Sequence, residues 1–258
     1  MNKFIVTGFI FLLSVTSCIK DLLCINGNSD LQTESRDAEV FNAILNVTAV
    51  DVIYHKADSI SITVTAESNL LPHIITRTSD GRLEIRTDPK NACLDYNVKP
   101  VITISSPELN NLELTGSGTI TADSLSGSTV SVKLTGSGDI QSAYISAGDV
   151  SYLVTGSGNS SHHKVLCQNA DFTITGSGDL NVQGSGTDAK MKITGSGDIK
   201  AGDFQLSSAN DIISGSGNII TYVEDILTAS ITGSGNIYLS GNPQVSQTIT
   251  GSGRIIKQ

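Results

Sequence analysis

The stretch that decides the fold is Ile193-Thr194-Gly195-Ser196-Gly197-Asp198-Ile199. Its G-S-G tripeptide recurs through the second half of the chain at intervals of 18 to 20 residues. The flanks recur with it. An aliphatic residue and a threonine or serine precede the first glycine, and two positions after the tripeptide seven of eight residues are aliphatic. Eight copies carry these flanks and begin at Gly116, Gly136, Gly156, Gly176, Gly195, Gly215, Gly233 and Gly251, while a ninth at Gly184 is out of phase and lacks them. A fixed period of this length indicates a repeat architecture.

Each repeat contains two short strands around a glycine turn, because aliphatic and polar residues alternate on both sides of it. One coil of this size cannot bury its own apolar face. Stacked coils about 4.8 Å apart turn each aliphatic column into an internal ladder. We therefore predict an all-β fold, a single parallel β-helix with stacked T-G-S-G turns over residues 111–258. Ile199 and Ile219 are expected to lie against each other inside it.

Residues 34–110 have the same strand chemistry without the tripeptide. Asp80-Gly81 is typical of a hairpin or coil turn. We expect this N-terminal β part to start the stack and to cover its first edge, because an uncovered edge invites aggregation. Alternating apolar residues predict strands at 50–54, 59–65, 83–86 and 101–104.

The first residues indicate export. A positive start and a short apolar run predict a signal peptide over residues 1–17, since the run is too short to span a bilayer. Val15-Thr16-Ser17-Cys18 is typical of a bacterial lipobox, so Cys18 is the predicted lipidation site and residues 18–33 form a lipidated segment or linker. The alternative is an ordinary signal peptide with a chance cysteine. The predicted location is the cell envelope, anchored to the outer membrane through lipid.

The charge of the chain limits the kinds of molecule that it is expected to bind. The formal net charge of −9 and the scattered acidic residues disfavour nucleic-acid binding, which needs a clustered basic face. The membrane, through the lipid anchor, and a glycan or surface protein remain the candidate partners, and no cofactor is expected.

Cys24, Cys93 and Cys167 leave an odd number of thiols. A bridge between Cys24 and Cys93 is one possibility, and Cys167 is expected to act as a small buried hydrophobe.

The lipobox, the early Cys24-Ile25-Asn26-Gly27-Asn28 segment, the alternating strands and the serial G-S-G-[DN]-I turns resemble the auto-transporter adhesin family known for its head GIN domain. The resemblance covers residues 36–256. It implies a right-handed β-helix related in shape to pectin lyases, in exported proteins of Bacteroidota-like bacteria. It also implies a role in adhesion without conserved catalytic groups.

The position after each tripeptide is rich in Asp and Asn. Asp179 and Asp198 are expected to stand one above the other, which makes them weak candidates for a calcium site. A structural role is favoured, because Asp and Asn side chains bond to nearby backbone in turns, and no metal site is predicted. His162 and His163 stand where Ser160 replaces an aliphatic residue, which indicates a local bulge. Neighbouring strand residues point to opposite faces, so the two histidines are not expected to share a metal.

No catalytic residue is predicted, because the recurring serines have no matched base at a fixed spacing. The leading hypothesis is a non-catalytic envelope lipoprotein that adheres to a glycan or surface through the flank of the β-helix. One alternative is a polysaccharide-active enzyme of pectin-lyase shape. The other is a structural envelope module without a specific ligand.

Overall fold

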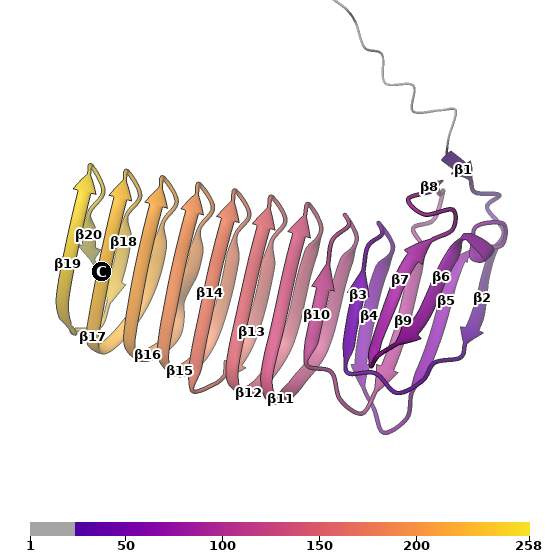
Figure 1. Ribbon diagram of the computed structural model, residues 1–258, viewed down its shortest axis with the longest axis horizontal. Coiled ribbons are helices and arrows are strands. Elements are labelled where there is room, and N and C mark those ends of the chain that lie inside the picture. Colours follow the sequence, from indigo (N-terminus) through magenta and orange to yellow (C-terminus); the bar gives the residue numbers. More distant parts are fainter. Residues whose placement is uncertain (1–23) are drawn as a thin grey trace, which may run out of the picture.

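The computed structural model describes residues 24–258. The predicted signal peptide and Cys18 therefore lie outside the described residues. Within 24–258 most of the chain is β-strand, and its helical content is one 3-10 turn, η1 (Leu71–His73). Most of the strands stack into a long rod of parallel coils, which confirms the predicted β-solenoid (Figure 1).

Most coils of the rod are one long strand rather than the two short strands expected, whereas the coils over residues 160–176 and 237–251 do have two strands. β11 (Thr119–Gly136) pairs in parallel with β12 (Asp139–Gly156) along almost its full length. The strand stays paired around the far corner because coil-to-coil hydrogen bonds continue there, and it breaks at the G-S-G turn. The later coils are formed by β13 (Ser160–Leu166), β14 (Asn169–Gly176), β15 (Leu180–Gly195), β16 (Ile199–Gly215), β17 (Ile219–Gly233), β18 (Ile237–Ser240), β19 (Gln244–Gly251) and β20 (Ile255–Lys257).

The G-S-G turns stack along one corner of the rod, where neighbouring backbones come very close. The amides of Ser157 and Gly158 both donate to the Gly136 carbonyl of the preceding coil, at 2.9 and 3.1 Å. Gly156 has a φ of +121°, in the region that favours glycine. A Cβ on Gly158 would lie 2.0 Å from the Gly138 carbonyl oxygen. The two glycines therefore meet separate demands, one conformational and one steric.

The aliphatic columns form the core, as predicted. Ile199 and Ile219 are direct neighbours in the register and both are fully buried. Ser160 takes the aliphatic position between Ile140 and Leu180 and is buried as well. The expected bulge follows it, because the register between β13 and β15 shifts after His162. Every coil thus keeps the same inside and outside, even where one polar residue enters the core.

The residues before the repeats start the stack. β3 (Ala43–Asn46) and β4 (Asp51–Lys56) pair in parallel with β10 (Asn111–Leu114) and β11. On their other side β3 and β4 pair in parallel with β7 (Arg82–Thr87) and β9 (Val101–Ser106). Antiparallel pairing begins beyond these strands, and β6 (Ile74–Ser79) and β7 form the hairpin expected at Asp80-Gly81. The remaining elements here are β1 (Cys24–Asn26), β2 (Leu31–Arg36), β5 (Ser61–Glu67) and β8 (Cys93–Asp95).

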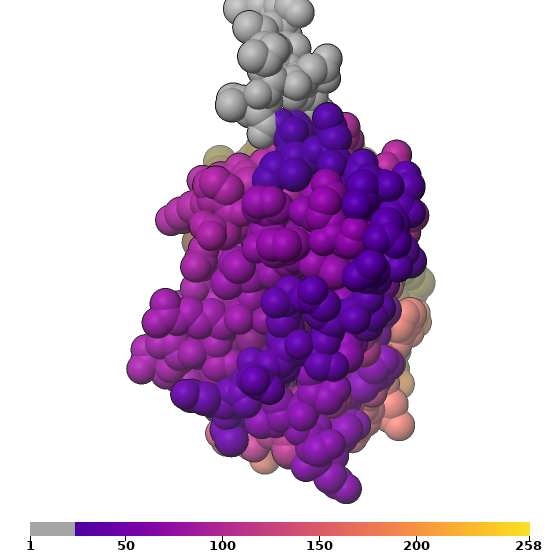
Figure 2. Space-filling model, turned by 90° about the vertical axis from the view of Figure 1, so that its right-hand side faces the viewer, coloured from indigo at the N-terminus to yellow at the C-terminus, as the bar shows by residue number. Residues whose placement is uncertain are grey.

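The two ends of the rod differ. At the head end, β2 pairs antiparallel with β5, and Leu70 and Leu71 beside η1 are buried. Figure 2 shows this end covered by residues from the early part of the chain. In the last coil Val245 and Ile249 continue the core columns but are 39% and 37% exposed. The head therefore closes the core, and the last coil leaves its apolar side chains partly open.

Candidate functional sites

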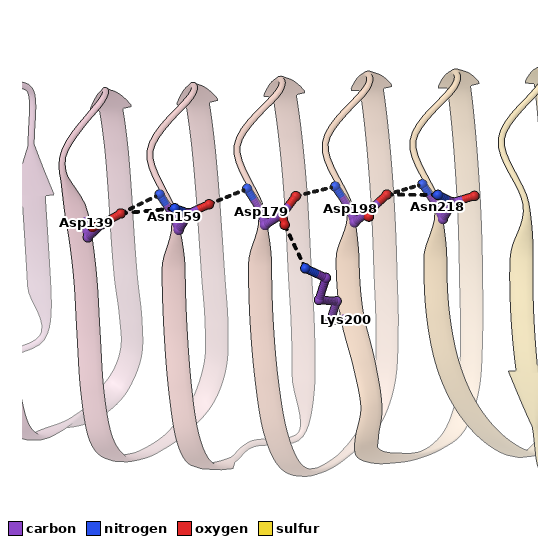
Figure 3. A network of polar contacts seen from close by, with 6 residues as sticks. All are labelled: Asp139, Asn159, Asp179, Asp198, Lys200 and Asn218. Atoms are coloured by element: carbon purple, nitrogen blue, oxygen red, sulfur yellow. Dashed lines mark hydrogen bonds and ion pairs between the residues drawn. The ribbon is translucent and has the colours of Figure 1, made fainter.

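Asp and Asn side chains join successive coils in one continuous row (Figure 3). Each side-chain oxygen accepts the backbone amide of the equivalent residue in the next coil. Asp179 Oδ1, for example, accepts the Asp198 amide at 3.0 Å, and Asp198 Oδ1 accepts the Asn218 amide at 2.8 Å. We call this row the Asx ladder; it comprises Asp139, Asn159, Asp179, Asp198, Asn218 and Asn236.

The two calcium candidates are engaged within this ladder. Asp179 and Asp198 do stand one above the other, as expected. The second oxygen of Asp179 lies 2.7 Å from Lys200 Nζ, and this hydrogen bond raises the pKa of Lys200. Within residues 24–258, no group of three or more His, Cys, Asp or Glu side chains is arranged to hold a metal ion. The observed contacts give the ladder a role in coil-to-coil bonding.

His162 is a buried polar group inside the rod. Its Nδ1 lies 2.7 Å from Ser142 Oγ and its Nε2 lies 2.8 Å from Ser160 Oγ. The ring stacks on Tyr152 with centroids 4.2 Å apart. His163 points outward, so the two histidines face opposite sides as expected. Burial, assisted by the neighbouring His163, lowers the pKa of His162 to about 3.

Acidification should therefore destabilise the rod through His162. The folded-state pKa lies below the ordinary value of 6.5, so the contribution of this group is complete above pH 6.5 and is lost as the pH falls toward 3. At pH 5 the loss relative to pH 7 should be about 2 kcal/mol. Urea unfolding of wild type and His162→Gln at both pH values measures it. The difference between the two proteins should change by this amount, whereas His163→Gln should keep most of the wild-type pH dependence, because burial is the larger cause of the lowered His162 pKa.

At the head, one carboxylate holds the segment that follows Cys24. Glu67 is fully enclosed. It accepts the Ser29 amide at 2.5 Å and the Asn97 amide and side-chain Nδ2 at 2.9 Å each. These bonds, led by that of the Asn97 side chain, lower the pKa of Glu67. A Cβ on Gly27 would lie within 2 Å of this carboxylate, so a larger residue there would displace Glu67 from its bonds to Ser29 and Asn97.

A disulfide also ties this segment down. Cys24 and Cys93 are bonded and face each other across β1 and β8. Two cavities, of about 650 and 280 Å³, lie beside the disulfide bond, and Ala49, Leu94 and Tyr96 line both.

Cys167 is free and only partly buried, although it packs against the core as expected. Burial raises the pKa of its thiol to about 11, which makes it a poor nucleophile.

Two tyrosine side chains, Tyr222 and Tyr238, face outward on the flank of the last coils. Ile220, Tyr238 and Ile256 are direct neighbours in successive coils, and Tyr222 lies two residues beyond Ile220 on the same side. We call these four residues the tyrosine face. Within residues 24–258, the rings and hydroxyls of Tyr222 and Tyr238 have no hydrogen-bonding, aromatic or cationic partner.

Tyr144, on β12, is the useful contrast. Lys164 lies over its ring, 5.7 Å from the centroid, so a side chain of the protein already occupies that position. The tyrosine face was not predicted from the sequence, because that analysis considered charged, histidine, serine, asparagine and cysteine side chains but no tyrosine. A signal was present, because Tyr222 and Tyr238 occupy outward positions of the alternating pattern.

The sequence also matches a family model over residues 40–243, and the description of that family is "Putative auto-transporter adhesin, head GIN domain". The chain belongs to this family. The match covers most of the residues that build the head and the rod, and it confirms the family resemblance carried by the G-S-G turns. No curated protein matches the sequence.

Solved structures of related chains have the same fold as this member of the head GIN family. One is described as a putative lipid binding protein from Parabacteroides distasonis. It is 29% identical with a TM-score of 0.83, and the match covers 91% of this chain and 99% of that one. A putative adhesin from Parabacteroides merdae is 26% identical with a TM-score of 0.85, covering 92% and 99%. No helix formed by the described residues has the length and hydrophobicity needed to span a membrane.

Proposed function

We propose that this protein is a non-catalytic, lipid-anchored module of the cell envelope that adheres to a glycan through the flank of its rod. The supporting observation is the tyrosine face, Ile220, Tyr222, Tyr238 and Ile256, which lies on a regular sheet surface with both rings unpartnered. The family description and one related structure, both naming a putative adhesin, agree with this role.

The chemistry of the face suits a sugar better than a charged ligand. A tyrosine ring offers a flat apolar surface and a hydroxyl that seeks a hydrogen-bond partner. The C–H face of a pyranose ring packs on such a surface, and its hydroxyls bond at the rim. None of the four residues carries a charge, although the chain as a whole has a net charge of −9. Ile220, Tyr238 and Ile256 lie one above another at strand spacing in three successive coils, so an extended saccharide could contact all three.

A glycan array with labelled protein tests the proposal. Wild type is expected to bind a subset of the glycans, and a Tyr222→Ala, Tyr238→Ala double variant should lose at least about tenfold in affinity, since two stacking contacts are removed. Tyr144→Ala is the matched control and should bind like wild type, because Lys164 covers that ring. Equal binding by all three proteins would exclude the tyrosine face. No binding by wild type would exclude a glycan as the ligand.

The anchor is a separate part of the proposal and depends on Cys18. The disulfide holds Cys24 at the head, six residues after Cys18, so a lipid on Cys18 would tether the rod by its head end. Palmitate labelling of cells should mark wild type. Cys18→Ala should lose the label and leave the membrane fraction, or remain unprocessed. Wild type that takes up no label would contradict the anchor without affecting the test of the tyrosine face.

A further inference from the structure

One polar layer of the core has no explanation in the stacking pattern. Asp211 on β16 and Thr221 on β17 are both fully buried. Neither oxygen of Asp211 bonds to a protein atom within the described residues, and neither does Thr221 Oγ1. Leaving such groups unsatisfied costs free energy, so native proteins nearly always give them a partner.

The two residues belong to columns that face each other across the core. Tyr152 stands four residues before its corner glycine, Gly156, and His162 stands four residues after Gly158; their rings stack at 4.2 Å. Asp211 has the same place before Gly215, and Thr221 has the same place after Gly217. The first column passes from Tyr152 through Phe172 and Met191 to Asp211.

Each of the two residues has one small neighbour and one large neighbour in its column, the large ones being Met191 beside Asp211 and Leu239 beside Thr221. Ala229 follows Asp211 in the next coil, and Ala201 precedes Thr221. Around the Gly156–Gly158 turn the same two positions are filled by the rings of Tyr152 and His162, whereas around the Gly215–Gly217 turn both positions hold short side chains. We propose that Asp211 and Thr221 form an internal site that binds water, which bridges the carboxyl group and the hydroxyl.

Water fits this site better than a cation does. Burial alone raises the pKa of Asp211 to about 8, so the carboxyl is mostly protonated at neutral pH. The neighbours in its column, Met191 on β15 and Ala229 on β17, carry no charge. A neutral carboxyl donates to water, and the water can donate in turn to Thr221 Oγ1. Buried waters usually make about three such bonds to otherwise unsatisfied groups.

High-resolution crystal structures of wild type and of an Asp211→Leu, Thr221→Val double variant test the site. Wild type should show water within hydrogen-bond distance of both side chains, and the variant should not. A direct bond between Asp211 and Thr221, or an empty layer, would overturn the proposal. So would a rise in the melting temperature of wild type, but not of Asp211→Asn, when Na⁺ or Ca²⁺ is added.

A double-mutant cycle gives an independent solution readout. Thr221→Val removes one partner of the water. It should lower the ratio of folded to unfolded protein about tenfold in wild type, but little in the Asp211→Leu background. Thr228→Val, at an exposed position of the same strand, should have no effect in either background. Equal effects of Thr221→Val in the two backgrounds would mean that the two side chains share no water.

Discussion

Replacing Gly197 by alanine is expected to destabilise the rod by on the order of 4 kcal/mol, among the larger effects of a single substitution. The new Cβ would lie 2.0 Å from the Gly178 carbonyl oxygen and 3.1 Å from a methyl group of Ile174. Both contacts are with the preceding coil, so relief requires the two coils to separate. Thermal unfolding followed by circular dichroism measures the effect.

Ser196→Ala is the matched control for this substitution. Ser196 lies in the same turn, and its contact with the preceding coil is made by its backbone amide, which donates to the Gly176 carbonyl at 2.9 Å. Alanine keeps that amide, so the change in stability should stay below about 1 kcal/mol. A Gly197→Ala protein as stable as Ser196→Ala would mean that the coils are less tightly fixed at this corner than the structure indicates.

The second large effect has the opposite sign: Asp211→Asn is expected to stabilise the protein at pH 7. In the unfolded chain the carboxyl is ionised, with an ordinary pKa of 3.8, and folding must return a proton to it because the buried pKa is about 8. At pH 7 this protonation costs about 4 kcal/mol. Asparagine has nearly the same shape and does not ionise, so the cost disappears.

The pH dependence separates this cause from a packing effect. Because the folded-state pKa lies above the unfolded one, the stability contributed by Asp211 is complete below pH 3.8 and is lost as the pH rises toward 8. The advantage of Asp211→Asn should therefore grow between pH 4 and pH 7. Urea unfolding at both values measures it, with Asp203→Asn, an exposed residue of the same strand, as control. An advantage that does not change with pH would refute the ionisation argument.

Much of the rod could be predicted because each coil repeats the same alternation of buried and exposed positions. Ile199 and Ile219 were placed correctly by counting from the nearest glycines, and Asp179 and Asp198 were correctly stacked. The far corner of each coil was not foreseen. No residue type recurs there, so no sequence signal shows that β11 continues through it as a single strand.

The polar features that matter at the head and in the core were harder to find. Glu67 is bonded by Ser29 and Asn97, which are distant in the sequence, and only the folded chain brings them together. Asp211 lies two residues before the buried Ile213, so the alternating pattern does place its side chain inside. A single aspartate in a core column does not indicate a partner, because aspartate side chains are usually exposed to solvent.

Each coil pairs only with the coils next to it, and this affects how long the rod can be. Among the described residues 24–258, β16, for example, is hydrogen-bonded to β15 and β17 and to no other strand. A whole coil inserted between two others would therefore meet surfaces that already match it, and would lengthen the rod by about 4.8 Å. The glycine corner and the Asx ladder keep any such insertion in register. Length is thus a quantity that gene duplication can adjust in single-coil steps, and with it the distance between the head and the outermost coil.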